Sequence, residues 1–76
     1  MDILKRLGLN IKRLRKQHKL SQEAFGFESG IHRTYISDVE RGARNPSVTQ
    51  VEKFAKALNV TPGHLLDADP KKGAQR

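Results

Sequence analysis

The chain has 76 residues, of which 36% are hydrophobic and 30% charged, and its formal net charge is +7. It is predicted to form one small domain with a modest core, because domains near this size bury only about 60% of their unfolded surface. It contains no cysteine, which excludes disulfides and thiolate metal sites, and no apolar stretch approaches the length of a membrane span. The basic excess favours an anionic partner, either a nucleic acid or an acidic membrane surface.

The first predicted helix runs from about Asp2 to His18. Its apolar residues recur at spacings of three and four, which is the periodicity of an amphipathic helix. The other faces are basic and are predicted to be solvated, while Leu9 points outward. The apolar face consists of Leu4, Leu7, Ile11, Leu14 and His18.

A second helix is predicted from Gln22 to Ser29, with Ser21 as its N-cap and Phe25 as its main core residue. Gly26 is unfavourable inside a helix, so its presence suggests that another helix passes very close. Phe27 lies off the face of Phe25 and is predicted to be partly buried against a neighbouring helix.

A tight turn at Gly30 separates this helix from a third one, which runs from roughly His32 to Arg41. Gly30 can adopt a positive φ at little cost, and Gly42 is predicted to end the third helix in the same way. Ile36 and Val39 would face the core.

Two further helices complete the folded part. Ser47 and Gln50 have capping-box spacing at the start of a fourth helix, for which Asn59 is a plausible stop. Thr61 followed by Pro62 opens a short fifth helix over residues 62–66. The apolar face of the fourth helix comprises Val48, Val51, Phe54, Ala55 and Leu58.

The predicted fold is therefore all-α, a compact five-helix bundle that contains a helix-turn-helix. Residues 1–66 form the domain and residues 22–41 the motif. Residues 67–76 have no apolar content to bury and are predicted to be a disordered tail.

The exposed face of the third helix carries side chains suited to the edges of DNA bases. Side chains opposite Ile36 and Val39, at 100° per residue, point away from the core. Arginine can bridge O6 and N7 of guanine, serine and threonine can meet several base edges, and a helix fits the major groove. The residues on or beside this face are Arg33, Thr34, Tyr35, Ser37, Asp38 and Arg41.

Residues before and after this face are predicted to lie near phosphates. In a helix-turn-helix the first helix crosses the DNA backbone while the second enters the groove. Backbone contacts give salt-dependent affinity without reading sequence. Residues 44–47 can equally form a plain turn before a capped helix, and the two interpretations are compatible. The residues concerned are Gln22, Arg41, Arg44 and Asn45.

Two opposite charges are predicted on inward helix edges. Glu40 lies beside Val39 on the third helix, and Arg15 follows Ile11 by four residues on the first. A lone buried charge is very costly, so each needs a partner. We therefore expect an Arg15–Glu40 ion pair between the two helices.

Nothing in the sequence suggests catalysis, and we expect no enzyme activity, cofactor, metal or small-molecule effector. The histidines lack metal-ligand spacing, so His18 is predicted to be a core-edge residue and His32 a helix-start residue, while His64 has no assigned role. No serine lies in a nucleophile elbow and there is no Gly-rich phosphate loop.

The sequence resembles the phage-repressor-like (Xre-type) helix-turn-helix family from about Leu7 to Leu66. Within that family, LSQEAF and SGIHRTYISDVERGARNPS are similar to the controller proteins of restriction–modification systems, which are small homodimeric regulators. The family fold is a compact bundle of five helices. The matching motif residues are Gln22, Phe25, Gly26, Gly30, Ile31, Ile36 and Val39.

The resemblance implies that Arg33, Thr34 and Ser37 read bases. It also implies backbone contacts by Tyr35 and Gln22, with Arg41, Arg44 and Asn45 nearby, and it agrees with the Arg15–Glu40 pair. The family dimerises through its C-terminal part, which here implies Val60, Leu65 and Leu66. The alternative is that these three residues only close the monomer core.

The leading hypothesis is a cytoplasmic, sequence-specific transcription regulator that binds double-stranded DNA as a homodimer on a roughly palindromic operator. Two recognition helices would enter successive major grooves about 34 Å apart. A second hypothesis is an antitoxin of the same fold that neutralises a toxin and also autoregulates its operon. Membrane-surface binding through the basic face of the first helix is a weaker option, because the core needs the apolar face of that helix.

Overall fold

The computed structural model describes residues 2–68, and in that range it contains five α-helices and no strand. The all-α, five-helix prediction is confirmed, and each helix boundary lies within one residue of its predicted position. Residues 69–76, most of the predicted tail, lie outside the described residues. The helices are α1 (Ile3–Gln17), α2 (Gln22–Ser29), α3 (Arg33–Glu40), α4 (Val48–Leu58) and α5 (Pro62–Leu66).

Local side chains determine where these helices begin and end. At each helix start in residues 2–68 a side chain accepts a hydrogen bond from a backbone N–H of the first turn, as Ser21 Oγ does from Ala24 at 3.0 Å. α2 ends at Gly30 with φ 73°, and α4 ends at Asn59 with φ 60°. Such left-handed residues stop a helix and satisfy its last carbonyls. The capping residues are Asp2, Ser21, His32, Ser47 and Thr61.

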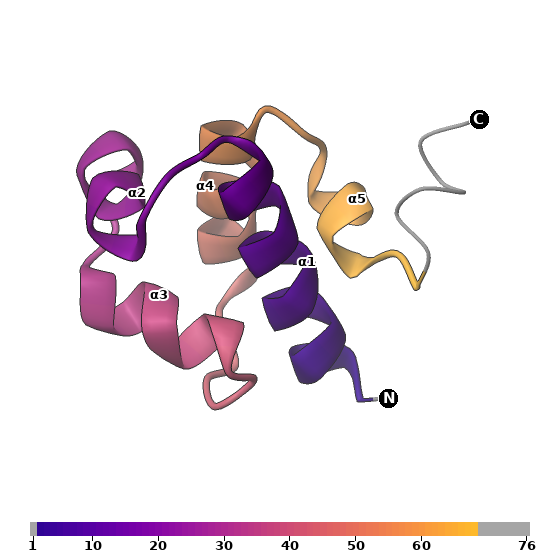
Figure 1. The fold of residues 1–76 in the computed structure, drawn as a ribbon. Helices are drawn as coiled ribbons and strands as arrows, with labels where there is room; N and C mark the ends of the chain where they lie inside the picture. The colour runs from indigo at the N-terminus through magenta and orange to yellow at the C-terminus, as the bar shows by residue number, and fades with distance from the viewer. Residues whose placement is uncertain (1, 69–76) are drawn as a thin grey trace.

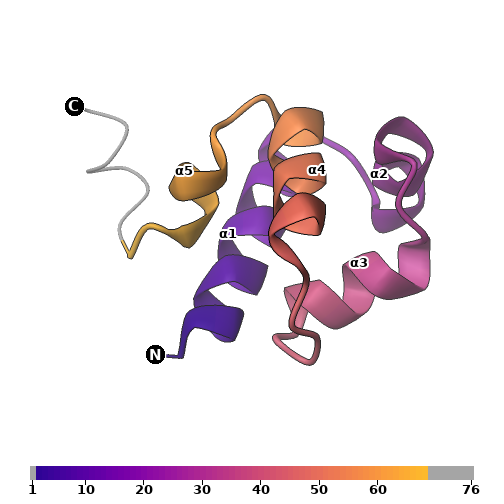
Figure 2. The ribbon, with the colours of Figure 1, turned by 180° about the vertical axis from the view of Figure 1, so that it is seen from behind.

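α1 and α4 form the middle of the molecule, with α2 and α3 on one side and α5 on the other (Figures 1 and 2). The core lies between them, and the rings of Phe25 and Phe54 meet there with centroids 6.0 Å apart. Burying such side chains is the main source of stability in a domain of this size. The remaining core residues are Leu7, Ile11, Leu14, Ile31, Ile36, Val39, Val51, Ala55, Leu58 and Leu65.

Gly8 lets the backbones of α1 and α3 approach each other closely. A Cβ atom built on Gly8 would lie 2.4 Å from the carbonyl oxygen of Val39 and 2.6 Å from that of Glu40. Such distances leave no room for a side chain, so this contact requires glycine at position 8. The local sequence around Gly8 did not indicate this contact.

Gly26 marks a close approach, as predicted, and the turn before α3 comes nearer to it than α3 itself. A Cβ atom on Gly26 would lie 2.9 Å from the carbonyl oxygen of Ile31, in the turn before α3. The tightest contact is therefore with the turn of the motif, and α3 itself follows at 3.7 Å (Arg33 N) and 3.8 Å (Ile36 Cδ1).

Three side chains predicted to be buried or half-buried are exposed. Phe27 is 85% exposed, because α2 lies at the edge of the bundle and buries only Phe25. Val48 is 83% exposed, because it begins α4 at the end of its apolar face. His18 is also exposed, at the C-cap of α1, with Nε2 3.2 Å from the carbonyl oxygen of Leu58.

The capping box of α4 is half formed. Ser47 Oγ accepts a hydrogen bond from the backbone N–H of Gln50 at 3.2 Å. The return bond is missing, since Gln50 Oε1 is buried without a partner in residues 2–68.

A buried asparagine on α1 fastens the C-terminal helix. Asn10 Nδ2 donates to the carbonyl oxygens of Leu65 at 2.8 Å and Asp67 at 3.0 Å. These bonds satisfy carbonyls at the end of α5, which its own helix leaves unpaired.

No helix in the described range is long and apolar enough to cross a membrane.

Candidate nucleic-acid interface

α3 has one buried face and one exposed face. Ile36 and Val39 are completely buried against the rest of the bundle. On the other side Arg33 and Thr34 are exposed and Ser37 is half-buried. Arg33 and Ser37 are four residues apart, so they lie one above the other on the same helix face. The structure therefore brings the three predicted base-reading residues together on one accessible surface.

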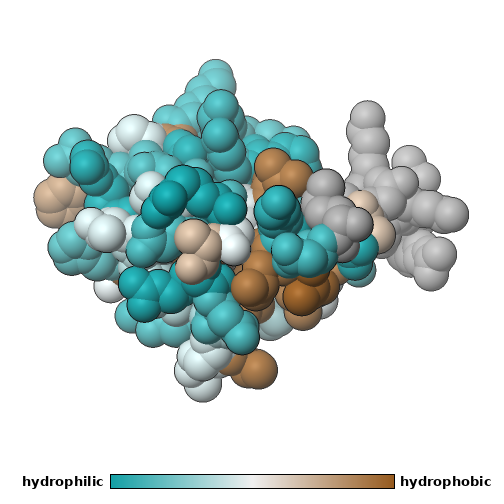
Figure 3. Space-filling view, turned by 90° about the horizontal axis from the view of Figure 1, so that it is seen from below, coloured by the Kyte–Doolittle hydropathy of each residue, from teal (hydrophilic) through white to brown (hydrophobic). Residues whose placement is uncertain are grey.

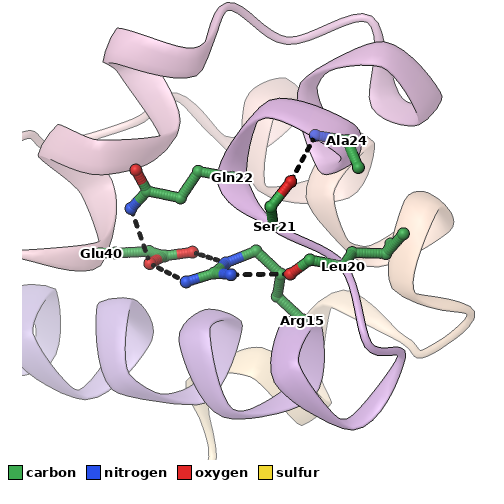
Figure 4. A network of polar contacts seen from close by, with 6 residues as sticks. All are labelled: Arg15, Leu20, Ser21, Gln22, Ala24 and Glu40. Carbon is green, nitrogen blue, oxygen red and sulfur yellow. Dashed lines mark hydrogen bonds and ion pairs between the residues drawn. The ribbon is translucent and has the colours of Figure 1, made fainter.

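A buried ion pair holds α3 against α1 (Figure 4). Arg15 Nε donates to Glu40 Oε2 at 2.7 Å, and Arg15 Nη2 donates to Glu40 Oε1 at 3.0 Å. The two side chains are only 8% and 3% exposed. Arg15 Nη1 also donates to the carbonyl oxygen of Leu20, after the end of α1, at 2.7 Å. The fork geometry of arginine thus satisfies both carboxylate oxygens and one backbone carbonyl.

Gln22 extends this network to α2, a role that the sequence analysis missed. Gln22 Nε2 donates to Glu40 Oε1 at 3.1 Å, so the carboxylate receives hydrogen bonds from α1 and α2 (Figure 4). The amide has a second N–H and a carbonyl oxygen that this bond does not use. The predicted backbone contact of Gln22 is therefore compatible with its place in the network, which orients its amide group.

Asp38 is paired with two arginines. Its Oδ1 accepts a hydrogen bond from Arg41 Nη2, and its Oδ2 accepts one from Arg44 Nη2 at 3.3 Å. The side chain of Asp38 is 22% exposed, against 65% for Arg41 and 49% for Arg44. Hydrogen bonds from Arg41 and then Arg44 hold the pKa of Asp38 below its usual value. The pairing of Asp38 with Arg41 could have been predicted from the sequence, because residues three apart on a helix are neighbours. The pairing with Arg44 could not, because Arg44 lies in the loop after the helix.

Tyr35 joins this cluster to the core. Its ring is nearly parallel to that of Phe54, with centroids 6.3 Å apart and an interplanar angle of 20°. Arg44 Cζ lies 4.9 Å from the centroid of the Tyr35 ring, within the range of a cation–π contact. The half-buried ring thus places the Arg44 guanidinium beside α3. Asn45 is exposed in the following loop.

The residues predicted to form a dimer interface differ in exposure. Leu65 is completely buried in the monomer core, which agrees for this residue with the alternative of a core-closing role. Leu66 is 38% exposed and Val60 is half-buried. On α1, Ile3 and Leu9 are about half exposed. Figure 3 shows hydrophobic surface on the side of the molecule where α1 and α5 lie.

His32 begins α3 as predicted, and its Nδ1 accepts a hydrogen bond from the backbone N–H of Thr34 at 3.1 Å. This bond occupies one ring nitrogen in a structural role. In the part of the chain that the structure describes, no three histidine or acidic side chains are grouped so that they could hold a metal ion.

The chain is similar in sequence to a known family and to a control protein. A family model described as helix-turn-helix matches residues 11–65. Control protein C.BamHI of Bacillus amyloliquefaciens is 49% identical over 61 residues, which cover 79% of this chain and 75% of the relative.

Solved structures give the same result. The restriction–modification controller protein C.AhdI from Aeromonas hydrophila is 42% identical, with a TM-score of 0.77 and coverage of 82% of this chain and 94% of that one. The controller protein C.Esp1396I, solved as a tetramer in complex with its natural 35 base-pair operator, is 31% identical. Its TM-score is 0.77, and the match covers 86% of each chain.

Proposed function

The chain belongs to the helix-turn-helix family of Xre type, whose model matches residues 11–65, and we propose that it is a sequence-specific transcription regulator that binds double-stranded DNA as a homodimer. The observation that carries this proposal is the exposed face of α3, on which Arg33, Thr34 and Ser37 lie together. Such a face supplies hydrogen-bond donors and acceptors of the kind that read base edges in the major groove.

The contacts divide into two kinds. In this proposal Arg33, Thr34 and Ser37 read bases: Thr34 and Ser37 lie on the face opposite the buried residues of α3, and Arg33 flanks them at the N-terminal end of the helix. A second set contacts the DNA backbone and sets the register without reading sequence. That second set is Gln22, Tyr35, Arg41, Arg44 and Asn45.

Two copies bind a roughly palindromic operator, with their recognition helices about one helical turn apart. The exposed side chain of Leu66 and the half-buried one of Val60 contribute to the dimer contact, while Leu65 supports them from the core. Support for assembly on DNA comes from C.Esp1396I, which binds its operator as a tetramer.

The proposal further assigns the chain to the controller proteins of restriction–modification systems. Its support is the similarity to C.BamHI and C.AhdI, at 49% and 42% identity. A DNA-binding regulator of this kind acts in the cytoplasm. It requires no catalytic residue and no cofactor.

Selection of binding sites from a pool of random DNA duplexes tests the proposal. We expect enrichment of a two-fold symmetric consensus, because two identical α3 helices would read two half-sites. Failure to enrich any sequence, with folded protein, would contradict sequence-specific binding. An asymmetric consensus with monomeric protein would contradict the dimer.

A further inference from the structure

Asp38 is a carboxylate at the centre of a surface that otherwise carries positive charge. Its two oxygens are each taken by a different arginine, one from the end of α3 and one from the loop that follows. Asp38 is the least exposed of the three side chains, so the arginines lie over it and reach towards solvent. The cluster consists of Asp38, Arg41 and Arg44, and its net charge is +1.

This arrangement resembles the way in which arginines hold a phosphate. A carboxylate and a phosphate both accept charge-assisted hydrogen bonds from guanidinium N–H groups. The centroid of the Tyr35 ring lies 4.9 Å from Cζ of Arg44. The aromatic ring and the carboxylate of Asp38 therefore both hold the Arg44 guanidinium. A DNA phosphate that approaches either arginine therefore competes with an acceptor already in place.

We propose that Asp38 acts as an internal substitute for DNA phosphate, holding Arg41 and Arg44 in the free protein and so limiting the affinity for DNA. The inference rests on the proposed function and concerns the same surface. Because phosphate contacts carry no sequence information, the limit applies to operator and unrelated DNA alike. Asp38 would thereby raise the protein concentration at which DNA becomes occupied.

The test is Asp38→Asn, which keeps the size of the side chain and removes its charge. Affinity is measured over a range of salt concentrations, on the duplex selected from random DNA and on a scrambled duplex. We expect roughly threefold to tenfold tighter binding to both, since exposed ion pairs are individually weak. The slope of log affinity against log salt should steepen by about 0.9 for each bound subunit, as expected for one more effective positive charge per subunit.

Glu52→Gln is the matched control. It removes the same charge from an exposed residue of α4 that makes no ion pair in the described part of the chain. We expect it to change affinity far less than Asp38→Asn does. In an Arg41→Gln, Arg44→Gln background, the effect of Asp38→Asn should disappear, because no arginines remain to be released.

Each other outcome contradicts the inference. Equal effects of Asp38→Asn and Glu52→Gln would show a general charge effect, and weaker binding would show that Asp38 positions the arginines productively. A changed preference at one operator position would make Asp38 a base reader. If the wild-type chain binds no duplex, the proposed function itself is wrong. If the wild-type chain binds the selected duplex but the Asp38→Asn variant gives one of the contrary results above, only the inference about Asp38 is wrong. Asp38→Ala replaces the asparagine variant if thermal unfolding shows that the latter does not fold.

Discussion

Arg33 and Arg44 are both exposed, but the structure gives them different surroundings. Arg33 makes no side-chain hydrogen bond in residues 2–68, whereas Arg44 pairs with Asp38 and lies over Tyr35. In the proposed complex Arg33 can therefore adapt to a base edge, while Arg44 must leave Asp38 to contact a phosphate. Single substitutions at the two positions should have different consequences.

Arg33→Ala should weaken operator binding by about 1–3 kcal/mol and relax the preference at one operator position. The reason is the loss of a bidentate contact to one base. Arg44→Ala serves as the comparison and should weaken binding to all sequences alike, with a flatter salt dependence. Selection of binding sites with both variants measures the base preference, and titrations at several salt concentrations measure the affinity and its salt dependence. If the Arg33→Ala variant selects the same consensus as the wild type, Arg33 does not read a base.

The titration of Asp38 is a second test at the residue scale. Its pairing with Arg41 and Arg44 favours the charged form, so the pKa in the folded state lies below that in the unfolded chain. The stabilising contribution is therefore present above the unfolded pKa and is lost as the pH falls through the folded one. NMR titration of the carboxyl carbon should give a midpoint below the usual aspartate value.

Arg41→Gln should raise that midpoint more than Arg44→Gln does, because Arg41 makes the larger contribution to the lowered pKa of Asp38. A wild-type midpoint at or above the usual aspartate value would mean that the two ion pairs do not persist in solution.

At the scale of elements, α3 is held by polar contacts from two directions. Arg15 reaches Glu40 from α1, and Gln22 reaches it from α2. These bonds connect both helices of the motif to the scaffold and help the buried side chains of Ile36 and Val39 to orient α3. Buried ion pairs are costly to break because the remaining charge is left unpaired.

Glu40→Ala should therefore lower the free energy of unfolding by about 3–5 kcal/mol. Denaturant titration measures the loss, and Glu52→Ala on exposed α4 is the control, with an expected change within about 0.5 kcal/mol. A loss below about 1 kcal/mol for Glu40→Ala would contradict a structural role for the pair.

The approach of α1 to α3 gives a prediction based on space alone. Gly8→Ala would place a methyl group 2.4 Å from a backbone carbonyl, so the helices must separate. Overpacking of this kind costs about 1–3 kcal/mol.

Gly63→Ala in α5 is the matched control for Gly8→Ala, because a Cβ atom there meets nothing within 4 Å. It should be neutral or stabilise by up to about 1 kcal/mol. Thermal unfolding of both variants is the measurement. If crowding is the cause, only Gly8→Ala lowers the melting temperature. If both variants lose stability equally, crowding at position 8 is not the cause.

At the scale of the whole molecule, the two leucines at the end of α5 serve different purposes. Leu65 is completely buried, so Leu65→Ala should cost about 2–5 kcal/mol of stability. Leu66 is 38% exposed, so Leu66→Ser should leave the monomer folded and weaken the dimer. Sedimentation and unfolding experiments on both variants separate the two effects. A Leu66→Ser protein that dimerises as wild type would place the dimer contact elsewhere.

Local chemistry made most of the fold predictable from the sequence. Caps such as Ser21, stops such as Gly30 and Asn59, and apolar spacing along α1 and α4 are properties of neighbouring residues. They indicate where helices begin and end, although helices this short also need tertiary packing to be stable. The exposed face of α3 followed from the same periodicity once Ile36 and Val39 were placed inward.

The tertiary structure alone decided which surfaces meet and which side chains are then left to solvent. Phe27 and Val48 are exposed because α2 buries only one residue and α4 begins beyond the core. The roles of Gly8 and Asn10 depend on the distance between helices that are far apart in sequence, which no local pattern encodes.

The same distinction applies to the candidate site. The outward-facing side chains of α3 were predictable from the sequence, because helical spacing places Thr34, Ser37, Asp38 and Arg41 opposite the core, with Arg33 beside them. The pairing of Asp38 with two arginines depends on the tertiary structure, because the loop after α3 brings Arg44 back to a carboxylate that already accepts a hydrogen bond from Arg41. Spacing determines the face of a helix, whereas the partners of a charge depend on how the chain folds back on itself.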